Sequence, residues 1–261
     1  MRQIHRGIRT SQAEDATKPF SAWTASVIAS KTIRCQEPLT SLQDDIAATK
    51  RILDLQPGPC ILVAHSYGGT VITEAGTDPH VIGLVYIAAH EPDAGETEAS
   101  NSKRFPSATS KTNAIEKTPD GYTYLDPAAF PEAFAADLPP EQAEFEAHSQ
   151  VLTAAGVFTT PVTDPAWKVK PSWALVADAD KIINPDLKRF YAARSYSQVV
   201  EATGASHSVY PSRPKEVAAL IEEAAPQAAL VSSTGSMEET PATRQIMAER
   251  CRRQSDCSTD C

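Results

Sequence analysis

Blocks of apolar residues alternate with blocks of amphipathic residues along this chain. Continuous apolar runs at 60–64, 81–89 and 173–177 are bounded by Pro, Gly or polar residues. Runs of this kind are typical of strands that are buried on both faces of a parallel sheet. A shorter apolar run at 199–200 indicates a fourth strand.

Segments with helical spacing separate these runs. Residues 41–55 carry apolar side chains three or four positions apart, with Ser41 placed to cap the helix and Pro57 placed after its end. Further helices are expected at 68–74, from Asn184 onward and at 213–224. Because strands and helices alternate, the pattern predicts the α/β class, with a doubly wound and mostly parallel sheet.

Residues 91–170 break this alternation. The segment is rich in Pro, Ala and Glu, and it has helical stretches near 128–136 and 141–155. Because it separates two core strands, we expect it to form a helical cap over the carboxyl edge of the sheet. Residues 20–225 would then form one α/β domain that contains this cap.

The two ends of the chain differ from the domain between them. Residues 1–19 are polar, have no clear period and form an atypical N-terminus. Residues 226–261 are rich in Ser, Thr and Glu and show little apolar periodicity. We expect this second segment to be mostly disordered, because it has few apolar residues to bury.

The charge of the chain excludes some partners. Of 261 residues, 24 are Lys or Arg and 33 are Asp or Glu, so the formal net charge is −9. An acidic surface disfavours nucleic acid and anionic membranes, and no apolar run approaches the roughly 20 residues that span a bilayer. No apolar segment follows the basic residues near the start, so we expect no secretory signal and a cytoplasmic location. The oligomeric state stays open.

The five cysteines do not form a metal-binding pattern. Cys35 and Cys60 lie in apolar runs and are expected to be buried thiols, whereas Cys251, Cys257 and Cys261 lie in the polar tail. Their spacing does not match the paired Cys-x-x-Cys motif of zinc sites. We therefore expect no metal and no cofactor.

The motif AHSYGG at 64–69 carries the clearest chemical signal. It lies between a predicted strand and a predicted helix, and it is a variant of the G-x-S-x-G elbow with Ala64 in place of the first Gly. The neighbours two before and two after the Ser must be small, because the turn is strained. We predict that Ser66 is a nucleophile and that the Tyr67 N–H, at the helix start, is an oxyanion donor.

A serine nucleophile needs a base and a carboxylate that orients the base. Asp180 follows the run at 173–177, just past the carboxyl end of a predicted strand, with Asp178 as the rival acid. His207 follows the strand at 199–200 in a loop of small residues, from which its imidazole can reach Ser66. We therefore predict a catalytic site made of Ser66, Asp180 and His207.

His90 is the other histidine that we expect at the pocket. It ends the run at 81–89, and we predict that it contacts the substrate; a polar residue that merely ends a strand is an equally good interpretation. His65 adjoins Ser66 but should point away from it by strand alternation.

Four segments together resemble a known family. VAHSYGGTVITEAG, GLVYIAAHEPDAGE, ADADKIINPDLKRF and ASHSVYPSRP resemble the small α/β-hydrolase esterases related to plant methylesterases and hydroxynitrile lyases. The resemblance covers residues of about 20–225 and implies an α/β-hydrolase fold. It also places Ser66, Asp180 and His207 at the catalytic positions. Hydroxynitrile lyases of this group have a Lys directly after the catalytic His, and Ser208 stands there instead, which argues against cyanohydrin cleavage.

The chain departs from this family near its start. Family members usually begin with an apolar central strand that ends in His-Gly, and the loop after it supplies a second oxyanion N–H. Here 21–23 resembles the end of that loop and 32–36 resembles the next strand. No apolar strand is visible before them, so neither the central strand nor the second donor can be identified.

These residues predict a serine carboxylesterase that cleaves a small ester. The alternative is a catalytically impaired member of the same fold that serves as a binding or interaction protein, because loss of one oxyanion donor lowers turnover roughly 100- to 1,000-fold. Labelling by a fluorophosphonate distinguishes the two.

Overall fold

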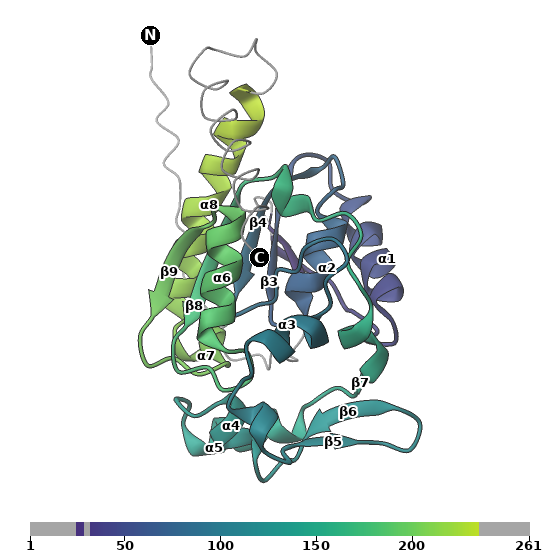
Figure 1. Ribbon diagram of the computed structural model, residues 1–261. Helices are drawn as coiled ribbons and strands as arrows, with labels where there is room; N and C mark the ends of the chain where they lie inside the picture. The colour runs from purple at the N-terminus through teal and green to yellow at the C-terminus, as the bar shows by residue number, and fades with distance from the viewer. Residues whose placement is uncertain (1–24, 29–31, 235–261) are drawn as a thin grey trace, which may run out of the picture.

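A six-stranded sheet forms the centre of the protein (Figure 1). The computed structural model describes residues 25–28 and 32–234. In spatial order β2-β1-β3-β4-β8-β9, the strands are β2 Thr32–Arg34, β1 Ala25–Ile28, β3 Cys60–His65, β4 Val81–Ile87, β8 Ser172–Ala177 and β9 Gln198–Ala202. Strands β3, β4, β8 and β9 are parallel, and β1 is antiparallel to both of its neighbours. The predicted α/β class with a mostly parallel sheet is confirmed.

Helices cover both faces of this sheet. They are α1 Leu42–Leu53, α2 Gly68–Ala75, α6 Pro185–Ser195, α7 Val209–Ser212 and α8 Pro214–Thr234. Along β3, Leu62 and Ala64 pack on the side of α1, α2 and α6, whereas Ile61 and Val63 pack on the side of α7 and α8. Because both faces are covered, β3 is buried along its whole length, as its uninterrupted apolar sequence predicts.

Side-chain caps fix the starts of two helices. Ser41 Oγ accepts a hydrogen bond from the Asp44 N–H at 3.1 Å at the start of α1. Asn184 Oδ1 accepts one from the Asp186 N–H at 2.9 Å at the start of α6. Both helices begin where the sequence predicts, because these side chains satisfy N–H groups that the helix leaves unpaired.

Strand β1, which the sequence analysis did not predict, follows residues 21–23 in the chain and runs antiparallel to β2 and β3. Ala25–Ile28 lies between β2 and β3, and Ala25 pairs with Ala64, beside the turn after β3. The sheet is therefore continuous at this point. The atypical segment 1–19 and the loop-like residues 21–23 lie outside the described residues.

The segment between β4 and β8 forms a cap beyond one end of the sheet (Figure 1). Its elements are α3 Glu98–Arg104, β5 Ile115–Lys117, β6 Tyr122–Leu125, α4 Phe130–Phe134, α5 Pro140–His148 and β7 Thr153–Ala154, with short 3-10 helices at Thr109–Lys111, Ala155–Thr159 and Ala166–Lys168. Strands β5, β6 and β7 make a separate antiparallel sheet. The predicted helical cap is present in α3, α4 and α5, and this small sheet is an addition that the sequence analysis did not predict.

The predicted helix at 141–155 is also too long, and side-chain hydrogen bonds explain its early end. After α5 ends at His148, the Gln150 side chain bonds both backbone groups of Leu125 in β6, each at 2.9 Å. Thr153 then pairs with Thr123 of the same strand. These contacts draw the chain away from the axis of α5 and into the small sheet.

Helix α8 extends into the segment that we predicted to be disordered. It continues to Thr234, beyond the boundary at 226, and Ala224 and Ala228 are fully buried on one of its faces. Ala228 Cβ packs close to Gly83 of β4. The prediction was wrong for 226–234 because small Ala side chains can pack tightly on a sheet without a strong apolar pattern. Residues 235–261 lie outside the described residues.

Two further expectations concern thiols and membranes. Cys35 and Cys60 are buried reduced cysteines, as predicted, and Cys251, Cys257 and Cys261 lie outside the described residues. Within the described part of the chain, no helix combines the length and the apolar content needed to cross a bilayer.

Replacing Ala228 with Asp should lower the thermal unfolding midpoint by several degrees, because the substitution places an unpaired carboxylate against β4. The matched control is Ala229→Asp, at the next and exposed position of the same helix. Thermal unfolding followed by circular dichroism measures both. Equal midpoints for the two variants would contradict the packing of 226–234 on the sheet.

Candidate active site

The turn between β3 and α2 has a strained backbone. Ser66 lies in it with a φ of 55°, a left-handed conformation that is uncommon for residues other than Gly. The Ser66 N–H donates to Ile87 O at 3.3 Å, and the His90 N–H donates to Ser66 O at 3.1 Å. A Cβ on Gly69 would lie 2.1 Å from His90 O, so the close approach of α2 to the end of β4 requires Gly there.

Ser66, His207 and Asp180 form a continuous chain of hydrogen bonds. His207 Nε2 lies 2.8 Å from Ser66 Oγ, and His207 Nδ1 lies 2.8 Å from Asp180 Oδ2. Because a carboxylate only accepts hydrogen bonds, Nδ1 carries the proton of the neutral imidazole and Nε2 accepts from the Ser66 hydroxyl. The structure thus brings together the three predicted residues in an arrangement that lets an imidazole take a proton from a serine.

Four donors hold Asp180 as a carboxylate. Oδ1 accepts from the N–H groups of Ile182 and Ile183 at 2.8 and 3.0 Å, and Oδ2 accepts from His207 Nδ1 and from Lys188 Nζ. Burial would raise the pKa of Asp180, but the charges and hydrogen bonds of His207 and Lys188 hold that pKa well below its usual range. Asp180 is therefore a permanent negative charge beside the imidazole.

Asp178, the rival acid in the sequence, makes a different contact. Its Oδ1 accepts a hydrogen bond from the Gly204 N–H at 2.6 Å, in the loop between β9 and α7. The geometry therefore assigns Asp180 as the carboxylate partner of His207 and Asp178 as a support of the loop that leads to it.

Lys188 belongs to this cluster, and the sequence analysis did not find it. The residue lies on α6 with a side chain that is 3% exposed, on the same helix face as Tyr191 and Ala192. A Lys within the buried stripe of a helix was the available signal, because a buried ammonium needs an acidic partner.

Cap residues bind both chain neighbours of His207. The Ser206 hydroxyl donates to Asp137, which lies between α4 and α5, and the Ser208 hydroxyl donates to Glu146 of α5 at 2.7 Å. The cap therefore fixes the loop that carries His207 as well as covering the site.

Two aromatic rings pack against the His207 imidazole. The Phe134 ring of the cap meets it edge-on, with 4.5 Å between the ring centroids. The His65 ring lies at the same centroid distance, and its Nε2 is 2.8 Å from His207 O. His65 thus supports the His207 loop, which sequence reasoning did not predict.

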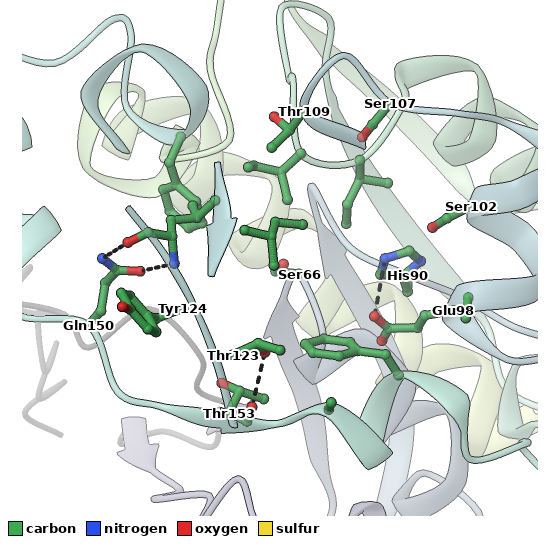
Figure 2. A pocket seen from close by; sticks show the side chains of 18 of the residues that line it. Ser66, His90, Glu98, Ser102, Ser107, Thr109, Thr123, Tyr124, Gln150 and Thr153 are labelled. Carbon is green, nitrogen blue, oxygen red and sulfur yellow. Dashed lines mark hydrogen bonds and ion pairs between the residues drawn. The ribbon is translucent and has the colours of Figure 1, made fainter. Parts of the chain in front are cut away.

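A cavity of about 400 Å³ lies between the sheet and the cap, and Ser66 forms part of its wall (Figure 2). Much of the wall is apolar, and it includes Ile115, Leu125, Phe134, Val151, Phe158, Ile182 and Ile183. Because the cap strands also contribute Thr123 and Thr153, the insertion sets the shape of the cavity.

His90 and Glu98 form a polar pair on one side of this cavity (Figure 2). His90 Nε2 lies 3.3 Å from Glu98 Oε2, and Glu98 Oε1 accepts from the Thr70 hydroxyl at 2.5 Å. Burial lowers the pKa of His90 to about 3 and raises the pKa of Glu98 to about 8. At neutral pH both groups are therefore uncharged, and their contact is a neutral hydrogen bond.

Tyr67 follows Ser66 at the N-terminus of α2. Its phenol donates to Asp45 Oδ2 at 2.7 Å, which ties the turn to α1. Its backbone N–H belongs to the first turn of α2, where the positive end of the helix dipole lies. Residues 21–23, which resemble the loop expected to supply a second N–H, lie outside the described residues.

Comparison with known families agrees with the motifs and with the fold. The family model described as "Alpha/beta hydrolase family" matches residues 18–220. This match covers more than half of the chain. The chain therefore belongs to the alpha/beta hydrolase family.

Individual relatives are distant. A protein from Phoma sp. described as a probable hydrolase is 26% identical over 182 residues, which cover 66% of this chain and 70% of that protein. Polyneuridine aldehyde esterase has a similar structure, with a TM-score of 0.60 at 14% identity over 72% of this chain and 80% of its own. A methylesterase from Arabidopsis has a TM-score of 0.58 at 17% identity, over 74% and 85% of the two chains.

A pyrethroid hydrolase from Sphingobium faniae is also similar, with a TM-score of 0.56 at 22% identity over 70% of this chain and 77% of its own. At these identities the solved structures show the fold alone. The predicted α/β-hydrolase fold is confirmed, and a plant methylesterase is among the proteins with a similar structure.

Replacing Glu98 with Gln should make the unfolding midpoint less sensitive to pH between about 5 and 8. The folded protein holds the Glu98 proton up to a pKa of about 8, whereas the unfolded chain releases it near the ordinary value of 4.5. The contribution of this group to stability is therefore complete below the unfolded value and is lost as pH rises toward 8. Gln cannot ionise, so this loss disappears.

Thermal unfolding at several pH values compares this variant with the native chain. The matched control is Glu116→Gln, at an exposed glutamate of β5, which should follow the native curve. If Glu98→Gln also follows the native curve, Glu98 is not held neutral by burial.

Proposed function

We propose that this member of the alpha/beta hydrolase family is a serine carboxylesterase that cleaves a small ester. The observation that carries the proposal is the buried chain of hydrogen bonds from Ser66 through His207 to Asp180, which ends at the wall of the cavity. The strained turn places the Ser66 hydroxyl beyond the end of β3, where it can attack a bound substrate.

The reaction follows from these contacts. Ser66 Oγ attacks the ester carbonyl carbon while its proton moves to His207 Nε2, and Asp180 stabilises the imidazolium without taking a proton. His207 then gives this proton to the departing alkoxide, which leaves an acyl group on Ser66. A water molecule attacks the acyl carbon while its proton moves to His207 Nε2. The bond from this carbon to Ser66 Oγ then breaks, Ser66 takes the proton back from His207, and the carboxylic acid is released.

The negative oxygen of the tetrahedral intermediate needs hydrogen-bond donors. We assign the Tyr67 N–H as one of them, because it follows the nucleophile directly at the N-terminus of α2. The dipole of α2 adds to the stabilisation at this end of the helix. Each such donor contributes roughly 3 kcal/mol to the transition state.

The cavity supports a small and uncharged ester as the substrate. Its volume of about 400 Å³ and its largely apolar wall suit a compact neutral molecule. Two of the structurally similar proteins are named as esterases, and a third is named as a pyrethroid hydrolase. These names favour ester chemistry for this chain as well.

The pair of His90 and Glu98 gives this cavity a polar side. Because both groups are uncharged at neutral pH, they suit a neutral polar group of the substrate, such as a hydroxyl or a keto oxygen, better than an ion. His90 is therefore assigned as a substrate contact.

Replacing Ser66 with Ala should abolish ester turnover by at least about a thousandfold, because no nucleophile remains. A panel of short-chain aryl and methyl esters gives the measurement, and the unfolding midpoint confirms that the variant folds. A fluorophosphonate probe gives a second readout, since it labels an activated serine covalently. The native chain and Ser102→Ala, which removes another serine of the cavity wall, should both be labelled.

If the native chain is neither labelled nor active on the panel, the esterase proposal fails. The fold would then serve as a binding or interaction protein, and ligand binding would replace turnover as the property to measure.

Replacing His90 with Leu should raise KM roughly tenfold for an ester that carries a hydroxyl or keto group, with little change in kcat. The paired measurement uses a matched ester that lacks the polar group, for which KM should change little. An equal loss on both esters would show that the His90 side chain acts on the structure of the site, through its contacts with Glu98 and Tyr191, and not on the substrate.

A further inference from the structure

Lys188 contacts the same carboxylate oxygen as the base. Asp180 Oδ2 accepts hydrogen bonds from both His207 Nδ1 and Lys188 Nζ, and the side chains of Asp180 and Lys188 are 0% and 3% exposed. Water therefore screens the Lys188 charge only weakly. Two donors on one oxygen place their nitrogen atoms no more than about 6 Å apart.

The ammonium of Lys188 adds one positive charge to the group of Asp180 and His207, both before and after His207 takes a proton. With a neutral imidazole, the ammonium of Lys188 and the carboxylate of Asp180 cancel. When His207 takes a proton from Ser66, two cations share one buried carboxylate. A site without Lys188 would instead become neutral at that step. The ammonium therefore opposes protonation of His207, both in the resting enzyme and during the reaction.

We propose that Lys188 is a positioning residue that sets the pH range of the reaction, because its charge keeps His207 unprotonated at lower pH than Asp180 alone would allow. The inference rests on the proposed esterase function for its kinetic consequence. The effect of the Lys188 charge on His207 depends only on the contacts around Asp180 and not on the esterase function.

Other ionisable groups also face this cluster. His65 packs on His207 and Tyr210 packs on His65, while Asp137 and Glu146 bind Ser206 and Ser208, the chain neighbours of His207. Three further groups interact electrostatically with His207 or Lys188: His90, Asp178 and Arg189. Arg189 is exposed and paired with Asp186 and Glu201. All of these groups are present in every Lys188 variant, so a comparison among the Met, Gln and Arg variants reports on the charge of Lys188.

The charge of Lys188 itself depends on a balance. Burial lowers the pKa of Lys188, and the adjacent Asp180 carboxylate opposes that change. A protonated Lys188 has a charge that acts on His207, whereas a neutral one would only donate a hydrogen bond. Replacing Lys188 with Gln, which keeps a hydrogen-bond donor without a charge, therefore changes the protonation of His207 only if Lys188 is charged in the native chain.

Three substitutions separate charge from hydrogen bonding. Lys188→Met removes both, Lys188→Gln keeps a donor without a charge, and Lys188→Arg keeps the charge. The matched control is Lys181→Met, which removes the same charge from a side chain that is 39% exposed and paired with Glu132. Unfolding midpoints show which variants fold, and the Gln and Arg variants decide the question if Met does not.

The first measurement is the titration of the His207 imidazole by NMR in a Ser66→Ala background, which needs no turnover. The midpoint should move upward by roughly one to two pH units in the Met and Gln variants, and it should stay near the native position in the Arg and control variants. If the His207 midpoint moves in Lys188→Met but stays at the native position in Lys188→Gln, the hydrogen bond and not the charge is responsible, and the proposal is overturned. An unchanged midpoint in both variants would overturn it as well.

The second measurement is the pH profile of kcat/KM with Ser66 intact. In the Met and Gln variants, the midpoint of the acidic limb of this profile should move to higher pH by the same amount as the NMR midpoint. On the acidic side, kcat/KM should then fall about tenfold for each pH unit of this movement. Failure to find any turnover would count against the esterase function alone, because the NMR titration still tests Lys188. A titration midpoint that moves while the kinetic limb stays in place would overturn the kinetic part of the proposal.

Discussion

The site depends on hydrogen bonds that join the carboxyl ends of the parallel strands. Beyond the regular pairing, Ser66 N–H donates to Ile87 O, Ala88 N–H donates to Leu175 O, and Ala179 N–H donates to Ala205 O. These bonds connect the turn after each strand to the next strand or turn. Because Ser66, Asp180 and His207 come from turns after β3, β8 and β9, these backbone contacts fix where the three turns lie relative to one another.

Burial of ionisable groups is the main energetic constraint on this arrangement, and the protein meets it in two ways. Asp180 stays charged because four donors surround it, two of them from the backbone. Glu98 and Glu91 instead take up protons, since burial raises the pKa of each to about 8. A charge is thus kept beside His207, and it is suppressed at Glu98 in the cavity wall and at the buried Glu91.

The contacts that the sequence could reveal are those with a local signal. Three residues can be recognised from their immediate neighbours in the sequence: Ser66 from its small-residue motif, Asp180 from the buried run before it, and His207 from its loop of small residues. The structure brings these three residues together. Glu98 has no such signal, and the only signal for Lys188 is its place within the buried stripe of α6. Each acquires its partner only when distant segments fold together, and the same applies to the pairing of Gln150 with Leu125 that ends α5.

The cap has a structural role in the site beyond covering it. Ser206 and Ser208, on either side of His207, are bound to Asp137 and Glu146 of the cap, and the Phe134 ring packs on the imidazole. The base is therefore held from the sheet by Asp180 and from the cap by its chain neighbours. A movement of the cap away from the sheet would loosen His207 at the same time as it opened the cavity. Under the proposed function, access for the substrate and the position of His207 would consequently be coupled, and the closed arrangement would be the one in which His207 can take the proton of Ser66.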